Sequence, residues 1–130
     1  VDSEDRLSYT TLVRLVECCR EHHWNTDILP RSKGIPIDSI TKSISGKFVR
    51  PILMGSEISI IYQVTGVRRK GYSLRFTVHD SSIQALCAEL STVSIFYDSQ
   101  EQRSVAPPAD VFEYLTSVCK RRVRHERSLE

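Results

Sequence analysis

The sequence predicts one α+β domain in which a buried helix packs against an antiparallel sheet. Two patterns support this prediction: an early helix that is apolar over most of its circumference, and four later stretches that alternate between apolar and polar residues. The size of the chain agrees, because 130 residues with 40% hydrophobic content suit a single domain with its own core.

The first helix is expected from Thr10 to about Trp24. Its apolar side chains recur at three- and four-residue steps, at Leu12, Leu15, Val16, Cys19 and His23. Val13 and Cys18 lie off this stripe, which predicts burial on several sides. Ser8 or Thr10 can cap the start of the helix through a hydroxyl. The following segment, NTDILPRSKGIPID, contains two prolines and a glycine and predicts a loop.

Four strands are expected next, at about residues 40–48, 58–67, 72–79 and 85–97. The third has the clearest alternation, with Tyr72, Leu74, Phe76 and Val78 on one face. Residues 68–71 (RRKG) predict a turn between the second and third strands. Two-faced strands joined by short turns predict an antiparallel sheet with one solvent-exposed face.

A second helix is expected from Asp110 to about Lys120, with Val111, Tyr114, Leu115 and Val118 on one side. The domain is therefore predicted to span residues 1–120. Residues 121–130 are predicted to be a charged tail that frays. A mostly apolar helix covered by such a sheet is the hot-dog arrangement.

Composition argues against several classes of function. The net charge of +2 predicts no polyanion partner, and the basic tail lacks the aromatic residues typical of nucleic-acid binding. No apolar run is long enough to cross a membrane, and no stretch is typical of a signal peptide. The chain begins with Val1, so we expect that the gene product begins upstream or was processed.

No metal site is predicted either. The four cysteines form no CxxC pair, and we interpret them as reduced residues of a cytoplasmic protein. His22 and His23 are adjacent, so on a helix they point about 100° apart and cannot easily chelate one ion. We expect His23 to be packed and His22 to lie at the surface.

The stretch from Asp2 to Arg20 resembles the signature of hot-dog thioesterases of the 4-hydroxybenzoyl-CoA thioesterase type. Asp2 matches the signature Asp, Tyr9 the aromatic residue before the helix, Arg14 the helix Arg and Glu17 the helix acid. Downstream, ISIIYQVTGVRRKGYSLRFTVHD is similar to the family's two long strands, and AELSTVSIFYDSQEQRSVAPPADVFEYL to its closing strand and final helix. The resemblance covers nearly the whole chain.

CCREHHW resembles, in addition, the CRE helix of hot-dog thioesterases that release polyketides from carrier proteins. That likeness implies a functional role for Arg20. The chain departs from the family at three positions: Asp5 stands where the family has Gly, and Arg6 and Thr11 stand where it has His or Asn. The subgroup has Asn where this chain has Asp2, and the family's first strand would precede Asp2.

The resemblance implies acyl-thioester hydrolysis. The N–H near Tyr9, at the start of the helix, would polarise the thioester carbonyl, since free N–H groups there favour negative charge. Asp2 would attack the carbonyl or activate water. The alternative for Asp2 is a solvated acid near the chain terminus, among Glu4 and Asp5.

Two more residues of the helix are candidates. Glu17 could be the catalytic acid, or a structural partner of Arg14 or Arg20 at three-residue spacing. Arg20 could clamp an acyl carboxylate or β-keto oxygen, or form an exposed ion pair with Glu17, or contact a partner chain. Beyond the helix, the basic cluster Arg68, Arg69 and Lys70 could bind the phosphates of CoA or an acidic carrier protein, or be a solvated turn.

The predicted function is therefore hydrolysis of an acyl-CoA or acyl-carrier-protein thioester, without a cofactor. Hot-dog domains resemble one another in pairing sheets edge to edge, which implies a homodimer or homotetramer with shared active sites. Two alternatives remain: a non-catalytic module that binds acyl thioesters, and another hot-dog enzyme such as a dehydratase, for which the adjacent pair His79-Asp80 is the candidate. Serine-histidine-aspartate catalysis has no support, because the chain has no GxSxG motif.

Overall fold

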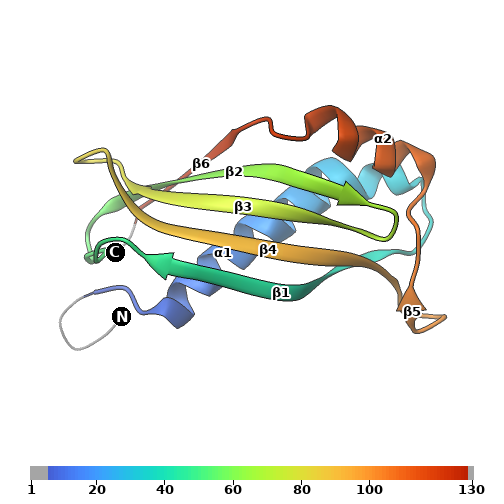
Figure 1. Ribbon diagram of the computed structural model, residues 1–130, viewed down its shortest axis with the longest axis horizontal. Coiled ribbons are helices and arrows are strands. Elements are labelled where there is room, and N and C mark those ends of the chain that lie inside the picture. Colours follow the sequence, from blue (N-terminus) through green and yellow to red (C-terminus); the bar gives the residue numbers. More distant parts are fainter. Residues whose placement is uncertain (1–5, 129–130) are drawn as a thin grey trace.

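The computed structural model of the chain describes residues 6–128 (Figure 1). The helical segments are α1 (Tyr9–His23), a π-helical turn η1 (Trp24–Ile28), a 3-10 turn η2 (Leu29–Ser32) and α2 (Ala109–Val118). The strands are β1 (Asp38–Phe48), β2 (Glu57–Arg68), β3 (Gly71–Asp80), β4 (Ala85–Asp98), β5 (Arg103–Ser104) and β6 (Val123–Ser128).

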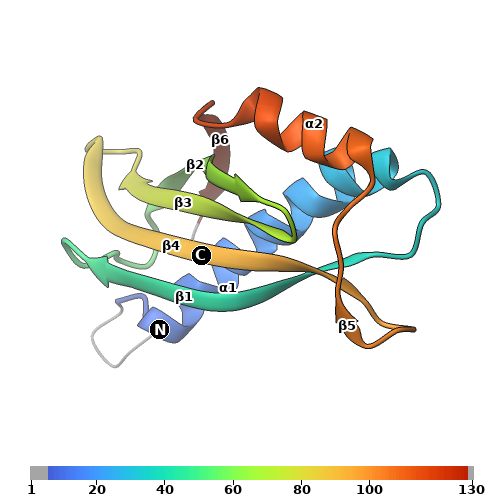
Figure 2. The ribbon, with the colours of Figure 1, turned by 45° about the vertical axis from the view of Figure 1, so that its right-hand side comes forward.

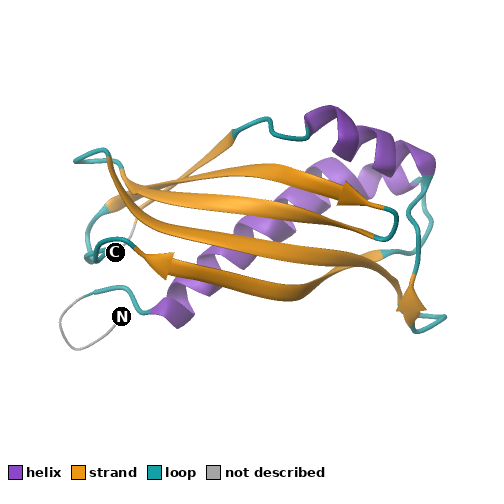
Figure 3. Ribbon diagram, in the orientation of Figure 1, coloured by secondary structure: helices purple, strands orange, loops and turns teal. Residues whose placement is uncertain are grey.

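The strands form one 6-stranded sheet in the order β1-β4-β3-β2-β6, and the short β5 pairs with β4. Every pairing in it is antiparallel. Figures 1 and 3 show α1 crossing one face of this sheet diagonally, and Figure 2 shows the sheet curving around it. The predicted α+β architecture, with a helix covered by an antiparallel sheet, is confirmed.

The helix α1 is held in place by its apolar stripe and by a cap. Leu12 and Val16 are fully buried, and Ser8 caps the helix by accepting a hydrogen bond from the Thr11 N–H at 3.2 Å. The helical path extends past the predicted end, because Trp24 and Ile28 are buried and continue the packed face. Packing has therefore overridden the local loop-forming composition of this segment.

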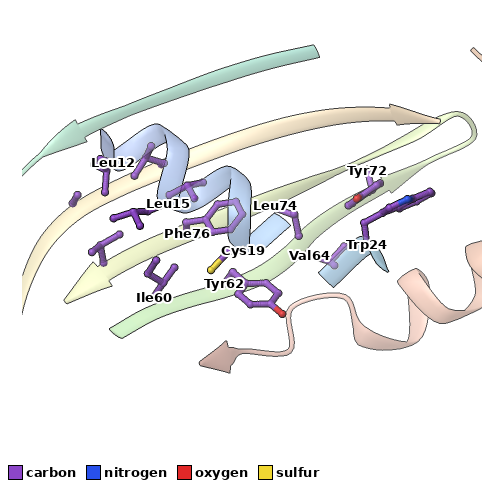
Figure 4. Packing of buried hydrophobic residues seen from close by; sticks show 14 of the residues in the cluster. Leu12, Leu15, Cys19, Trp24, Ile60, Tyr62, Val64, Tyr72, Leu74 and Phe76 are labelled. Atoms are coloured by element: carbon purple, nitrogen blue, oxygen red, sulfur yellow. The ribbon is translucent and has the colours of Figure 1, made fainter. Parts of the chain in front are cut away.

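The core lies between α1 and the inner face of the sheet. All four predicted strands are present, and the inward residues of β2 and β3 alternate as expected. Figure 4 shows these side chains meeting the helix. The largest fully buried members are Tyr72, Phe76, Phe96, Leu12, Ile28, Ile52, Ile58, Ile60, Leu74, Leu90, Leu115 and Val16.

The segment predicted to be a fraying tail differs from that expectation. Residues 123–128 form β6 and pair antiparallel with β2, with Tyr62 opposite Val123 and Glu57 opposite Ser128. The physical reason is that β2 would otherwise leave a row of backbone N–H and C=O groups unpaired at the edge of the sheet. The charged side chains of this segment predict solvent exposure, but they carry no information about the backbone hydrogen bonds that the edge of β2 can form.

The two histidines lie as predicted. His22 is exposed, and His23 is 2% exposed with its Nε2 3.1 Å from the Tyr114 hydroxyl. Within residues 6–128, no three histidine, cysteine or acidic side chains are grouped closely enough to hold a metal ion. The helices of this part of the chain are all too short or too polar to cross a membrane.

A first prediction concerns Gly71, where β3 passes close to β4. A Cβ atom there would collide with the Ser94 carbonyl oxygen, which is backbone and cannot move aside. We expect Gly71→Ala to lower the free energy of unfolding by about 1–3 kcal/mol, the usual cost of overpacking. At Gly66 the nearest atom is the Ser73 hydroxyl, 3.1 Å away and able to rotate, so Gly66→Ala is the matched control. Equal urea midpoints for the two variants would contradict this packing.

A second prediction concerns pH. Burial lowers the pKa of His23 below its ordinary value and outweighs the opposing effect of the Asp27 carboxylate. The unfolded chain therefore binds a proton more readily than the folded chain, and stability falls as pH drops below about 6.5, the ordinary histidine pKa. We expect His23→Gln to flatten the slope of unfolding free energy against pH between about 6.5 and 5. The charge of the exposed neighbour His22 is the smallest of the effects on the pKa of His23. His22→Gln should therefore flatten the slope less than His23→Gln does, and an equal or greater flattening would contradict the assignment to His23.

Candidate functional site

The start of α1 presents free backbone donors. Leu12 N donates to Ser8 O at 3.0 Å, and Thr11 N donates to the Ser8 hydroxyl at 3.2 Å. The first-turn N–H groups that remain are those of Tyr9 and Thr10, for which a helix offers no internal acceptor. These two groups lie at the positive end of the helix dipole, so they favour a developing negative charge on a bound group.

A groove of about 430 Å³ lies beside this helix start. One wall is the segment leading into α1, and the other is the end of β1 with the residues that follow it. The Tyr9 ring, 41% exposed, contacts the edge of the Phe48 ring with centroids 6.3 Å apart. The described lining includes two arginines and no acid: Arg6, Leu7, Ser8, Tyr9, Phe48, Val49, Arg50 and Pro51.

The two walls are tied together by backbone hydrogen bonding. Leu7 N donates to Ile52 O at 2.8 Å, and Arg6 forms an isolated bridge with Leu53. Leu7 is also buried. The entry into α1 is thus fixed relative to the end of β1, and the groove has a defined floor.

Of the predicted catalytic residues, Tyr9 lies in this groove and Asp2 lies outside the described residues. Asp5, which stands where the family has Gly, also falls outside them. The predicted attacking carboxylate therefore stays a prediction. Residue 6 is the first described position, and it already borders the groove.

Glu17 lies elsewhere, about 12 Å further along the helix axis from Tyr9 at 1.5 Å per residue. Its carboxylate accepts hydrogen bonds from Arg20 Nε at 2.7 Å and from the Thr41 hydroxyl of β1 at 2.8 Å. The three-residue spacing to Arg20 is the structural partnership that the sequence offered as one alternative. The contact with Thr41 was not visible in the sequence.

Arg20 is 5% exposed and spans from α1 to the sheet. Its Nη1 donates to the Ser39 hydroxyl at 2.9 Å, and that hydroxyl is 3.1 Å from the Tyr72 hydroxyl. Burial alone would lower the pKa of Arg20, but the hydrogen bond and charge of Glu17 outweigh it and raise that pKa. Arg20 therefore forms a buried network rather than the exposed ion pair considered from the sequence.

The basic cluster Arg68, Arg69 and Lys70 lies at the other end of the sheet. It forms the end of β2 and the turn into β3, and Lys70 O accepts a hydrogen bond from Phe96 N at 3.0 Å. Figure 1 shows this turn remote from the start of α1. Arg68 and Arg69 border a different groove, of about 490 Å³, beside α2. One chain therefore does not bring the basic cluster to Tyr9.

Sequence reasoning missed the cations that do border the groove, Arg6 and Arg50. Arg6 had been noted only as a departure from the family pattern. Arg50 lies between the first and second expected strands, where the sequence carries no pattern that singles it out. The available signal was the position of Arg50 directly after β1, because the end of that strand packs beside the helix start.

A third prediction tests the network of Glu17 and Arg20. Glu17→Gln leaves a buried guanidinium without its counter-charge, so we expect the free energy of unfolding to fall by about 2–4 kcal/mol. The matched control is the exposed pair Arg75–Glu89, 2.9 Å apart between β3 and β4. Glu89→Gln should cost less than about 1 kcal/mol. Urea denaturation measures both, and a loss at Glu17 no larger than that at Glu89 would refute the structural role.

Comparisons with known proteins agree with this geometry. A family model described as the thioesterase-like superfamily matches residues 6–115. The probable thioesterase YbaW from Escherichia coli is structurally similar, with a TM-score of 0.78, 16% identity, and coverage of 92% of this chain and 91% of that chain. No curated protein sequence matches the chain.

Two further structures are named for their ligand or substrate. The 1,4-dihydroxy-2-naphthoyl-CoA thioesterase Slr0204 from Synechocystis has a TM-score of 0.75 and 10% identity, covering 91% of this chain and 88% of that one. A thioesterase from Thermus thermophilus, solved with coenzyme A and zinc, has a TM-score of 0.74 and 14% identity, covering 91% and 85%. These likenesses establish the hot-dog fold predicted from the sequence. With its family model matched over residues 6–115, the chain belongs to the thioesterase-like superfamily.

Proposed function

We propose that this protein hydrolyses an acyl thioester of CoA or of a carrier protein, at the groove beside the start of α1. The observation that carries the proposal is the start of α1, where the N–H groups of Tyr9 and Thr10 lack an intrahelical acceptor and Tyr9 borders a groove. Membership of the thioesterase-like superfamily supports it.

Thioester hydrolysis needs hydrogen-bond donors that stabilise the negative charge formed during the reaction. When water adds to the thioester carbonyl, its oxygen becomes an oxyanion, and donors aimed at that oxygen lower the barrier. The C–S bond then breaks, the thiol leaves with a proton, and the free acid remains. The proposed donor is the Tyr9 N–H, and the proposed base or nucleophile is Asp2, as the family resemblance implies.

The groove also suits an anionic carrier. Arg6 and Arg50 line it, and a guanidinium binds phosphate oxygens strongly. CoA carries a pyrophosphate and a 3′-phosphate, and carrier proteins are acidic. Coenzyme A in the similar structure from Thermus thermophilus favours CoA as the first substrate to test.

We propose further that two copies pair through β1 and share their sites. This strand has 11 residues and ends the strand order, so one of its edges is available for pairing. Antiparallel pairing of two β1 strands brings the Asp38 end of one copy to the Phe48 end of the other. The basic turn Arg68–Lys70 lies near the Asp38 end, so the second copy would supply it to the end of the sheet that holds Tyr9.

For Arg20, the proposed role is to orient Glu17 and the sheet rather than to clamp the acyl group. The resemblance to polyketide-releasing enzymes implies a substrate contact. In the structure, its Nε and Nη1 donate to Glu17 and Ser39. A substrate contact would require breaking this buried network.

A fourth prediction tests the oxyanion donor directly. Tyr9 is the first residue of α1, a position at which proline is tolerated, and Ser8 already has the extended backbone (φ −76°, ψ 159°) that precedes proline. Tyr9→Pro thus deletes the N–H without breaking the helix, and we expect kcat for acyl-CoA hydrolysis to fall on the order of 100-fold. Tyr9→Ala keeps the N–H and removes the same ring, so it is the matched control.

The assay is release of free thiol from a panel of acyl-CoAs and β-ketoacyl carrier proteins. Asp2→Asn should abolish turnover while Glu4→Gln, a nearby acid, preserves it. A kcat for Tyr9→Pro within twofold of that for Tyr9→Ala would refute the role of the helix start. Binding of acyl-CoA by the wild type without any turnover would replace the hydrolase with the non-catalytic binding module.

A further inference from the structure

The groove of about 490 Å³ beside α2 has a different character from the one that holds Tyr9. One wall is the end of β2 with its turn into β3, and the other is the start of α2 with the residues that precede it. Figure 1 shows both walls at the end of the sheet away from the start of α1. The reaction proposed above gives the residues of this groove no catalytic role.

The floor of the groove is apolar, and one aromatic side chain in it is exposed. Val67 and Pro107 line the groove, and Phe112 of α2 lines it as well with 42% of its surface exposed. On its inward side α2 already buries Val111 and Leu115 completely, so the core does not use Phe112. A large aromatic side chain left exposed beside other apolar groups marks a contact surface for a partner.

The rim of the groove is basic. Arg68 and Arg69 are exposed, and neither has an ion-pair partner within residues 6–128. Glu113 is the only acid in the described lining, so two arginines against one carboxylate leave a net charge of +1. Asp110 at the start of α2 does not cancel this charge, because its carboxylate is paired with Lys33 at 2.6 Å. The groove therefore attracts an anionic partner.

Both walls are fixed before any partner binds. Arg68 pairs with Gly71 across the hairpin, and Lys70 O accepts a hydrogen bond from Phe96 N of β4 at 3.0 Å. In the other wall, Val111 in the first turn of α2 is fully buried. A preformed surface of this kind loses little conformational freedom on binding, which favours affinity.

We propose that this groove docks the acidic body of an acyl carrier protein. The proposal rests on the thioester hydrolysis proposed above and names one carrier of its substrate. Carboxylates of a carrier helix lie beside Arg68 and Arg69, and an apolar side chain of that helix packs against Phe112. In the dimer paired through β1, docking on one copy brings the thioester to the end of the sheet where the other copy holds Tyr9.

Two other occupants fit the groove less well. A nucleotide needs polar groups that recognise its base, but the polar side chains of the described lining are two exposed arginines and one exposed glutamate. An apolar centre inside a charged rim is instead typical of protein interfaces. A second copy of this chain would bring like charges together, which disfavours self-association here.

The first test measures docking apart from turnover. A fluorescein-labelled bacterial acyl carrier protein in its holo form is titrated with the full chain, and binding is followed by fluorescence anisotropy. We expect saturable binding that weakens as ionic strength rises, because salt screens the charges. Phe112→Ala should raise the Kd on the order of tenfold, as loss of an aromatic contact at the centre of an interface does. Arg69→Gln should raise it several-fold.

The matched controls lie outside the groove. Ile83→Ala removes an apolar side chain that is 59% exposed in the turn between β3 and β4, at the other end of the sheet. Arg122→Gln removes an exposed arginine that does not line the groove. Both variants should leave the Kd unchanged. Equal weakening by these controls would overturn the proposal, since general surface properties would then explain the binding.

Kinetics distinguish the carrier protein from CoA. For a β-ketoacyl carrier protein, Phe112→Ala should raise KM several-fold with kcat unchanged, whereas KM for the same acyl group on CoA should stay constant. An equal rise in both KM values would overturn the proposal and assign the groove to the CoA nucleotide. Self-association of the chain that Phe112→Ala abolishes would overturn it in favour of a second copy.

Docking and hydrolysis fail in different ways. A wild-type chain that hydrolyses acyl-CoA but binds no carrier protein, up to hundreds of micromolar, would overturn the docking surface and leave the hydrolase standing. Binding of the carrier protein that depends on Phe112 and Arg69, without turnover of either substrate, would support the docking surface and reject hydrolysis.

Discussion

The packing of α1 against the inner face of the sheet is the contact on which the rest of the structure depends. Leu12, Val16 and Cys19 on the helix are buried against strand residues such as Phe76 and Leu90. At about 25 cal/mol per Å² of apolar surface, burying one such side chain contributes about 1.5–3 kcal/mol. This contact fixes where the helix begins, and hence where its free N–H groups meet the end of β1.

Packing of an apolar stripe leaves the rotation of a helix about its axis only loosely specified, and the buried ion pair supplies the missing constraint. Glu17 must face Thr41, and Arg20 must face Ser39, for both charged groups to keep their hydrogen bonds to the sheet. A buried ion pair seldom adds net stability over apolar residues, but separating it is costly. Its effect is to select one orientation of α1, in which Tyr9 faces Phe48.

The two ends of the same helix therefore have different chemistry. At the start, free N–H groups and two arginines border an open groove. At the end, His23, Tyr62 and Tyr114 are among the residues that line a smaller cavity, which β6 helps to enclose. The segment forming β6 thus contributes to this cavity as well as covering the edge of β2, because Val123 is part of the cavity lining.

Much of the fold could be predicted from the sequence, because alternation along β2 and β3 and the stripe on α1 are local patterns. Within the predicted tail, residues 123–128 differ from the prediction, because they pair with β2 and local charge carries no information about such long-range pairing. The site was predictable only in part. Tyr9 followed from the family resemblance, whereas the proximity of Arg50 to it depends on how β1 packs beside α1.

The cavity at the other end was missed for a related reason. His23 and Asp27 are four residues apart, but the intervening residues predicted a loop, which hid their common helical face. Tyr62 and Tyr114 are distant in sequence from both residues. The pair that the sequence offered for a dehydratase, His79-Asp80, lies elsewhere, at the end of β3.

The central claim is that the start of α1 holds the thioester carbonyl. Its most direct test is backbone amide NMR during titration with a non-hydrolysable acyl-CoA thioether that keeps the carbonyl. The account predicts that the Tyr9 and Thr10 amides shift most, together with residues around Arg50. Saturable binding that leaves these two amides unmoved, while other parts of the chain shift, would contradict it.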